Sequence, residues 1–245
     1  MKSISKEKIL LLCLYFTLIF AIGATVIPII ESKRVMEMSD KERFSEIYRS
    51  QSWGGWKGVG PGSTIKDGAE PFLNFLQTFL NTHNDISSIV DIGCGYGELL
   101  KNITWPKNSR YLGLDIVDSV IKYNKEHYIK DNIEFATVDN VKSLAQFNGD
   151  LLIIKDVIQH WSIQKVLFAR DHIIPHFKYA IIVNNIRTSF STVKNSDILT
   201  GSSRPLDLEI APFFMKPALV KDYYLPPYRV KRIYLFVNKD FYHWN

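Results

Sequence analysis

The segment Ser88-Ile-Val-Asp-Ile-Gly-Cys-Gly-Tyr-Gly97 decides the fold of this chain. Its first five residues are mostly apolar and predict a buried β-strand, Ser88–Ile92. Three glycines follow at alternate positions, and a helical pattern begins at Tyr96. Glycine is required where a ligand touches the backbone, because any Cβ would collide with that ligand. The segment therefore predicts a strand, a ligand-binding glycine loop and a helix, in that order.

Acidic residues accompany this loop and indicate which ligand it binds. Asp91 lies two residues before the first glycine, and Asp115 lies near the end of the next predicted strand, where an acid can accept hydrogen bonds from ribose hydroxyls. A dinucleotide loop would need glycine at the position of Glu98, and its pyrophosphate would be repelled by Asp91. S-adenosylmethionine (SAM) carries a sulfonium cation and no phosphate, so nearby acids stabilise it. The loop therefore favours SAM over NAD.

From Ser87 onward, short apolar runs alternate with helical patterns. The predicted strands are Ser88–Ile92, Tyr111–Ile116, Ile133–Val138, Leu151–Lys155 and Tyr179–Asn184. The predicted helices between them are Tyr96–Asn102, Asp118–Tyr128, Val141–Phe147 and Ser162–Phe177. This alternation predicts a parallel sheet with right-handed crossovers. After a long loop, Arg229–Val237 and Phe241–Trp244 predict an antiparallel hairpin at one edge of the sheet.

The pattern Asp91-Ile-Gly-Cys-Gly-Tyr-Gly97, followed by Asp115 and by Asp139 after the third strand, resembles the class I SAM-dependent methyltransferases. The resemblance covers about residues 71–245. It implies an α/β, Rossmann-like fold with a seven-stranded sheet of order 3-2-1-4-5-7-6. It also implies that the glycines line the methionine and ribose of SAM, that Asp115 holds the ribose hydroxyls, and that Asp139 faces the adenine amine. The expected cofactor-binding residues are Asp91, Gly93, Cys94, Gly95, Gly97, Asp115 and Asp139.

Further motifs are similar to those of a largely uncharacterised methyltransferase group whose members often accompany surface-glycan genes. These motifs are Trp53-Gly-Gly, Gly60-Pro-Gly-Ser63, Lys155-Asp-Val-Ile-Gln-His160, Thr200-Gly-Ser-Ser-Arg-Pro-Leu-Asp-Leu208 and Pro212-Phe213. The chain departs from that group in its generic Gly-Tyr-Gly loop and in its apolar N-terminus. The resemblance implies a glycan or another small molecule as the methyl acceptor.

The acceptor is expected beyond the carboxyl end of the fourth strand, where ligands of parallel sheets bind. His160 is the candidate general base, with Asp156 as its orienting partner or as an alternative base. Trp53 belongs to a glycine-rich loop, residues 53–63, that could close over SAM or lie at a lipid interface. Arg204 could pair with an acidic group of the substrate or form a surface salt bridge. His160 could equally be a packing residue.

Residues 9–30 contain no charged side chain and would span roughly 33 Å as a helix, which is enough to cross a bilayer. They predict an uncleaved, single-pass membrane anchor over residues 1–34. A cleaved signal peptide remains the alternative, since Ala21, Gly23 and Ala24 are small. Basic residues flank both ends and leave the orientation open. Because SAM is made in the cytosol, we expect the catalytic domain, residues 71–245, to face the cytosol, joined by a linker and lid over residues 35–70.

The overall composition excludes other classes of function. The formal net charge is +5, and most of it lies within the first 34 residues, so no nucleic-acid partner is expected. The two cysteines are expected to be reduced, and the six histidines show no metal-ligand spacing. Two competing hypotheses remain: a membrane-anchored, catalytically inactive scaffold that binds SAM, and a nicotinamide dehydrogenase.

Overall fold

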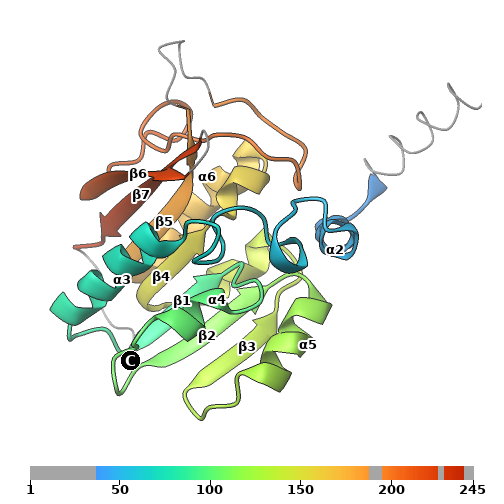
Figure 1. Cartoon of the computed structure of the whole chain (residues 1–245). Coiled ribbons are helices and arrows are strands. Elements are labelled where there is room, and N and C mark those ends of the chain that lie inside the picture. The colour runs from blue at the N-terminus through green and yellow to red at the C-terminus, as the bar shows by residue number, and fades with distance from the viewer. Residues whose placement is uncertain (1–36, 188–194, 226–228, 240–245) are drawn as a thin grey trace, which may run out of the picture. The chain divides into compact units, whose positions relative to one another are not determined.

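Figure 1 shows the computed structural model of the chain, which describes residues 37–187, 195–225 and 229–239. The chain contacts divide it into two units, residues 1–39 and 40–245, and only residues 37–39 of the first are described. The second unit begins at Asp40, earlier than the predicted start of the domain at residue 71. The segment expected to be a linker and lid is therefore, from Asp40 onward, part of the same compact unit as the sheet.

The second unit consists of alternating helices and strands. The α-helices are α2 (Asp40–Ser50), α3 (Glu70–Thr82), α4 (Glu98–Asn102), α5 (Asp118–His127) and α6 (Ile163–His172). The 3-10 helices are η1 (Trp56–Gly58), η2 (Val141–Gln146), η3 (Ile158–His160) and η4 (Ile174–His176). The strands are β1 (Ser88–Ile92), β2 (Arg110–Asp115), β3 (Ile133–Thr137), β4 (Gly149–Lys155), β5 (Phe177–Ile186), β6 (Leu219–Leu225) and β7 (Arg229–Val237).

The strands form one seven-stranded sheet of order β3-β2-β1-β4-β5-β7-β6, which confirms the predicted order. Strands β1 to β5 pair in parallel, and β7 pairs antiparallel with both β5 and β6. Because parallel strands end at the same edge, the residues that follow β1, β2 and β4 meet there. The fold thus brings the glycine loop, Asp115 and the turn after Lys155 together.

Both faces of the central strands are buried, which explains their continuous apolar sequence. In β4, the alternate residues Leu151 and Ile153 face the layer that contains α3, while Leu152 and Ile154 face the layer that contains α6. All four side chains are completely buried. The helices cover both faces of the sheet, as Figure 1 shows. A strand with two buried faces does not alternate between apolar and polar residues, so its continuous apolar run is what predicts it.

Two predicted elements differ from the structure. Arg229–Val237 is a strand as predicted, but its hairpin partner precedes it as β6 (Leu219–Leu225), and Phe241–Trp244 lies outside the described residues. The helix predicted over Ser162–Phe177 is divided into α6 and η4. Pro175 lies in η4, and a proline lacks the N–H that a continuing α-helix would need.

The predicted membrane anchor, residues 9–30, lies outside the described residues. Within residues 37–187, 195–225 and 229–239, no helix is both long and apolar enough to cross a bilayer.

Candidate active site

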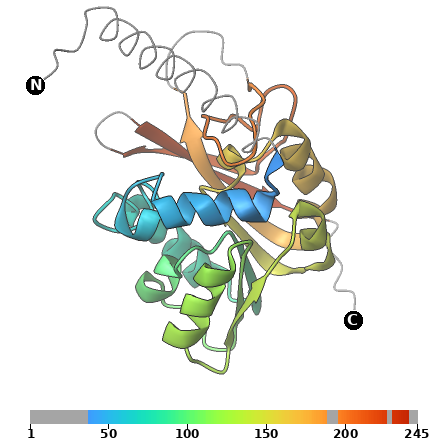
Figure 2. The same ribbon diagram turned by 90° about the vertical axis from the view of Figure 1, so that its right-hand side faces the viewer.

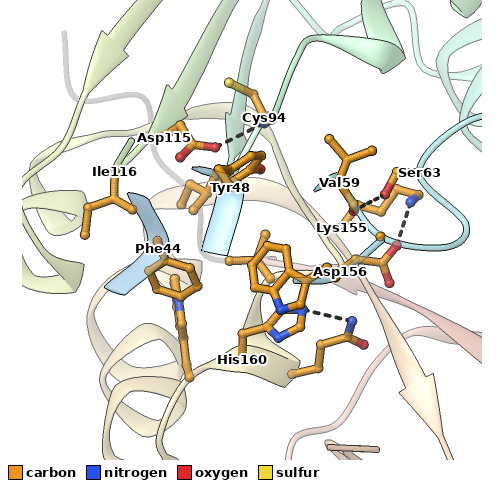
Figure 3. A pocket seen from close by; sticks show the side chains of 18 of the residues that line it. Phe44, Tyr48, Val59, Ser63, Cys94, Asp115, Ile116, Lys155, Asp156 and His160 are labelled. Carbon is orange, nitrogen blue, oxygen red and sulfur yellow. Dashed lines mark hydrogen bonds and ion pairs between the residues drawn. The ribbon is translucent and has the colours of Figure 1, made fainter. Parts of the chain in front are cut away.

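A cavity of about 350 Å³ lies at the carboxyl ends of the parallel strands. The glycine loop, the ends of β2 and β4, the turn η3 and helix α2 all contribute to its wall. Figure 3 shows side chains from these elements converging on one space, with Asp115, Tyr48 and His160 around it. Of the predicted site residues, those that line the cavity are Trp53, Asp91, Gly93, Cys94, Gly95, Asp115, Asp156 and His160.

The glycine loop is shaped by positive backbone angles that favour glycine. Gly93 has φ +71°, and a Cβ there would lie 2.3 Å from a methyl carbon of Val157. Gly95 has φ +52°, and its Cβ position has only ordinary van der Waals neighbours, so its backbone is open to the cavity. Gly97 begins helix α4 in the left-handed region, packs against Tyr128 and does not line the cavity. The structure gives Gly97 a role at the helix start, and its expected contact with SAM stays a prediction.

Two buried carboxylates stand beside this loop. Asp91 accepts a hydrogen bond from the Tyr111 hydroxyl at 2.6 Å, and burial raises its pKa to about 7 against the opposing effects of Tyr111 and Lys155. Asp115 accepts the backbone N–H groups of Gly95 at 3.1 Å and of Val117 at 3.0 Å. Burial raises the pKa of Asp115 to about 6 despite these hydrogen bonds. Both groups are costly to ionise without a cation nearby.

These residues fit SAM, because a sulfonium and an ammonium would compensate the two buried carboxylates. Asp115 lies at the end of β2, where its carboxylate can receive ribose hydroxyls, and the open backbone of Gly95 allows a close approach. Asp139 is exposed and lies outside the cavity wall, which instead includes its neighbours Val138 and Asn140. The structure therefore does not bring Asp139 together with the other predicted cofactor residues.

His160 faces the cavity as a neutral imidazole with a defined tautomer. Its Nδ1 lies 2.9 Å from the carbonyl oxygen of Ser202, which can only accept, so Nδ1 carries the proton. Its Nε2 therefore has the lone pair and lies 3.3 Å from the amide nitrogen of Gln159. That amide is oriented by the backbone N–H of Asn185, which donates to Gln159 Oε1 at 2.9 Å. Burial lowers the pKa of His160, which keeps the ring neutral at physiological pH.

Arg204 supports the turn that carries His160, which disfavours its expected role as a substrate contact. It is buried and does not line the cavity. Its Nη1 donates to the carbonyl oxygen of Trp161 at 2.6 Å, and its backbone N–H donates to that of Gln159 at 3.2 Å. Nearby, the Gly201 N–H donates to the His160 carbonyl oxygen at 2.8 Å. We name residues 200–204 the clamp segment, because its hydrogen bonds hold η3 and the following Trp161 in place.

Asp156 is an ion-pair centre, which disfavours its predicted roles as partner of His160 or as base. Its two carboxylate oxygens pair with Lys155, at 2.6 Å, and with Lys231. Burial alone would raise its pKa, but the two ammonium groups lower it to about 2. A carboxylate of that kind cannot accept a proton at physiological pH. The Ser202 carbonyl, and not Asp156, orients the His160 ring.

Helix α2 and the following loop form one wall of the cavity. Figure 2 shows α2 running across the molecule between α5 and α6. Phe44 and Tyr48 of α2 line the cavity, and both make edge-on ring contacts with Trp53. Trp53 in turn stacks on His160, with ring centroids 4.3 Å apart. The loop after α2 is therefore packed onto the site, and a direct contact of Trp53 with substrate stays a prediction.

Several residues of the site carried no recognisable signal in the sequence. Tyr111 looked like an ordinary strand residue, yet it hydrogen-bonds Asp91. Lys231 lies 75 positions after Asp156, and its burial could not be inferred from the alternation of β7. Lys155 was visible only as the last residue of a predicted strand. In the sequence, only the adjacent lysine and aspartate of the motif Lys155-Asp156 indicate an ion pair here.

The fold and the cavity define the class of this protein: a Rossmann-like α/β domain with a site for a cationic nucleoside cofactor. Comparison with known families agrees, because residues 90–170, about a third of the chain, match the family described as "Methyltransferase domain". The chain therefore contains a SAM-dependent methyltransferase domain of the class I fold, and its cofactor is SAM.

A curated relative is the malonyl-[acyl-carrier protein] O-methyltransferase of Acetivibrio thermocellus, which is 33% identical over 73 residues. The matched segment is 29% of this chain, and it spans only 25% of that relative. Among solved structures, magnesium protoporphyrin IX methyltransferase from Synechocystis with bound SAH (S-adenosylhomocysteine) has a TM-score of 0.55 at 15% identity, over 81% of this chain and 99% of that one. The same enzyme with bound SAM gives 0.53 at 14%, over 82% and 97%. At this identity the likeness concerns the fold alone.

Proposed function

We propose that this protein transfers the methyl group of SAM to an oxygen or nitrogen atom of a glycan or another small acceptor, near a membrane. The observation that carries the proposal is the neutral His160, which lines the same cavity as Asp91 and Asp115 and whose Nε2 carries no proton. A cofactor site and a general base therefore share one enclosed space. When bound, SAM supplies an electrophilic methyl group on its sulfonium.

The residues of the chain perform the remaining tasks. Asp115 and Asp91, which Gly95 and Tyr111 hold in place at the edge of the sheet, would bind the cofactor by charge and by hydrogen bonds. His160 Nε2 exchanges its hydrogen bond with the Gln159 amide for the acceptor hydroxyl or amine and takes the proton from it, while Nδ1–H stays bonded to Ser202. General bases contribute typically about 10²–10⁴-fold to the rate. Trp53 and Tyr48 exclude water from the cavity by their ring packing.

The glycan and membrane parts of the proposal have different support. The volume of about 350 Å³ has to hold the methionine and ribose parts of SAM as well, which favours a small acceptor. The motifs around Trp53, His160 and Arg204 supply the resemblance to a group associated with glycan genes. The apolar run of residues 9–30 supports a single-pass anchor, and the cytosolic supply of SAM favours a catalytic domain that faces the cytosol.

The test uses the full-length protein in detergent. Calorimetric titration with SAM, SAH and NAD is expected to show micromolar binding of the first two and none of NAD. Transfer of radiolabelled methyl groups is then measured on a panel of glycans, with His160→Gln as the comparison. Turnover that falls at least ~100-fold in His160→Gln, with SAH affinity unchanged, supports the mechanism. Binding of SAM without any turnover would favour the inactive scaffold.

A further inference from the structure

We propose that the methyl acceptor carries an anionic group, a carboxylate or a phosphate, which Lys155 and Arg229 bind. This inference rests on the proposed function and names the substrate class for the same site. It arises from an imbalance of charge on the two sides of the cavity. The acidic side, at the glycine loop, is matched by the cationic cofactor. On the basic side, at the end of β4 and the start of β7, Lys155 and Lys231 pair with a single carboxylate among the described residues.

The basic side is built on a buried ion cluster in which two lysines pair with one carboxylate, while Asp91 acts on Lys155 only from beyond ion-pair distance. Asp156 is the only carboxylate that the described residues pair with either lysine, and it serves both Lys155 and Lys231. The Lys155 side chain is 9% exposed and that of Lys231 is 1% exposed. Burial lowers the pKa of Lys231 to about 8 despite the attraction of Asp156, which shows the cost of its charge. Buried charges of one sign in excess are stabilised by a ligand of the opposite sign.

Lys155 has a donor to offer to such a ligand. Its ammonium carries three N–H groups, and two of them have acceptors, the Gly62 carbonyl oxygen at 2.7 Å and Asp156 at 2.6 Å. The residue lines the cavity. Figure 3 shows the Lys155–Asp156 pair on a different side of the space from Asp115. The third N–H of Lys155 has no acceptor in these two bonds and is therefore available to a ligand in the cavity.

Arg229 supplies the second cation at the same wall. It is exposed at the start of β7, two residues before Lys231, and it lines the cavity. In the described part of the chain, no carboxylate lies within 4 Å of its guanidinium. Lys165, the other lysine of the wall, differs because Asp40 already pairs with it at 2.6 Å. A guanidinium and an ammonium without full compensation form a suitable receptor for a carboxylate or phosphate.

The test measures anion binding separately from cofactor binding, on the full-length protein with and without saturating SAH. The probes are malonate and inorganic phosphate, with uncharged malonamide as the control ligand. We expect millimolar binding of at least one anion and no binding of malonamide. Lys155→Met and Arg229→Met are each expected to weaken the anion at least ~10-fold, as loss of a charge-assisted hydrogen bond predicts. Arg110→Met, an exposed arginine of β2 outside the cavity, is expected to change it less than ~2-fold.

The outcomes separate the inference from the proposed function. Anion affinities that are equal in the wild type, Lys155→Met and Arg229→Met would overturn the inference and leave the methyltransferase proposal intact. Loss of SAH affinity in Lys155→Met with unchanged anion affinity would also overturn it, because Lys155 would then serve the carboxylate of the cofactor. Failure of the wild type to bind SAH would count against the proposed function. In that case the titrations without SAH still measure anion binding. Because Arg229 is exposed, Arg229→Met tests the anion site even if Lys155→Met does not fold.

Discussion

Asp91 and Asp115 are carboxylates that are buried in the protein without a bound cofactor. Burial raises their pKa values to about 7 and about 6, so each holds a proton more readily than a carboxylate in water. A bound cation favours the ionised forms, and binding SAM below pH 7 therefore requires the release of protons. The titration of these two carboxylates therefore makes the affinity for the cofactor depend on pH.

We predict that SAM affinity falls as the pH decreases through about 7 and about 6, by at least ~10-fold between pH 8 and pH 5.5. SAH, which lacks the sulfonium charge, is expected to show a smaller decrease. Calorimetry across this range measures both. Asp91→Asn removes the group with the higher pKa and should flatten the part of the profile nearest pH 7. An affinity for SAM that is constant over this range would contradict the role assigned to these acids.

Asp115 and Asp139, which were expected to bind the ribose and the adenine of SAM, should contribute differently to cofactor affinity. Asp115 is buried in the cavity wall, whereas Asp139 is exposed outside it. Asp115→Ala is predicted to weaken SAM and SAH by ~10–100-fold, the usual value of hydrogen bonds to a charged group. Asp139→Ala, the matched control, is expected to stay within ~2-fold of the wild type. Equal losses in both variants would show that Asp139 reaches the cofactor after all. Circular dichroism checks that each variant is folded.

At the scale of elements, helix α2 is held to the domain by packing more than by charge. Phe44 is buried between the helix and the main core, while Lys41 forms an ion pair with Asp118 in which the side chains are 36% and 66% exposed. Phe44→Ala is predicted to lower the free energy of unfolding by ~3 kcal/mol or more. Lys41→Ala should lower it by less than ~1 kcal/mol, because exposed pairs contribute little. Urea unfolding of both variants tests this, and a larger effect of Lys41→Ala would reverse the interpretation.

The clamp segment is the second element whose packing positions the site. Arg204 is a buried cation whose guanidinium donates to the carbonyl oxygen of Trp161 and, at 3.4 Å, to that of Gln159. Arg204→Met is predicted to destabilise the domain by ~2–4 kcal/mol and to disturb the tautomer of His160. Arg110→Met, at an exposed position, is the control and should be near neutral. Urea unfolding gives the stability, and nitrogen NMR shifts of the His160 ring report the tautomer. Unchanged His160 shifts in a folded Arg204→Met would limit the clamp to a general structural role.

The elements differ in how well the sequence predicts them. Strands β1 to β5 are predictable within two residues; for β1, β4 and β5 the reason is that a strand buried on both faces is a continuous apolar run between polar segments. Strand β6 is not, since it is an edge strand whose first four residues, from Leu219, are all exposed and follow no alternation. The 3-10 helix over Val141–Gln146 was predicted as helix over nearly the same residues, and its Asn140 cap is local in sequence. Signals local in sequence, such as an apolar run or a helix cap, predict an element, and the exposed start of β6 has neither.

At the scale of the whole molecule, the sequence predicts the cofactor half of the site better than the acceptor half. The loop from Asp91 to Gly95 is contiguous, and its strand-loop-helix order places it at the edge of the sheet without further information. The acceptor half depends on contacts between residues far apart, such as His160 with Ser202 and Asp156 with Lys231. Each of these requires the order of the strands and the path of a long loop to be known. No periodicity in the sequence encodes such pairings.

The Asp156 cluster joins the parallel and antiparallel halves of the sheet, because Asp156 follows β4 and Lys231 lies in β7. Asp156→Asn is predicted to cost ~3–5 kcal/mol, since it leaves two buried ammonium groups without a carboxylate. Asparagine tolerates the positive φ of +60° at this position, so the effect is electrostatic. Lys231→Met should cost clearly less, because it leaves the balanced pair of Lys155 and Asp156. The double variant Asp156→Asn/Lys231→Met is expected to be more stable than Asp156→Asn alone, and urea unfolding of the complete cycle measures this coupling. Additive losses would show that the two residues do not act as a pair, and the link between β4 and β7 would then rest on the hydrogen bonds of the sheet.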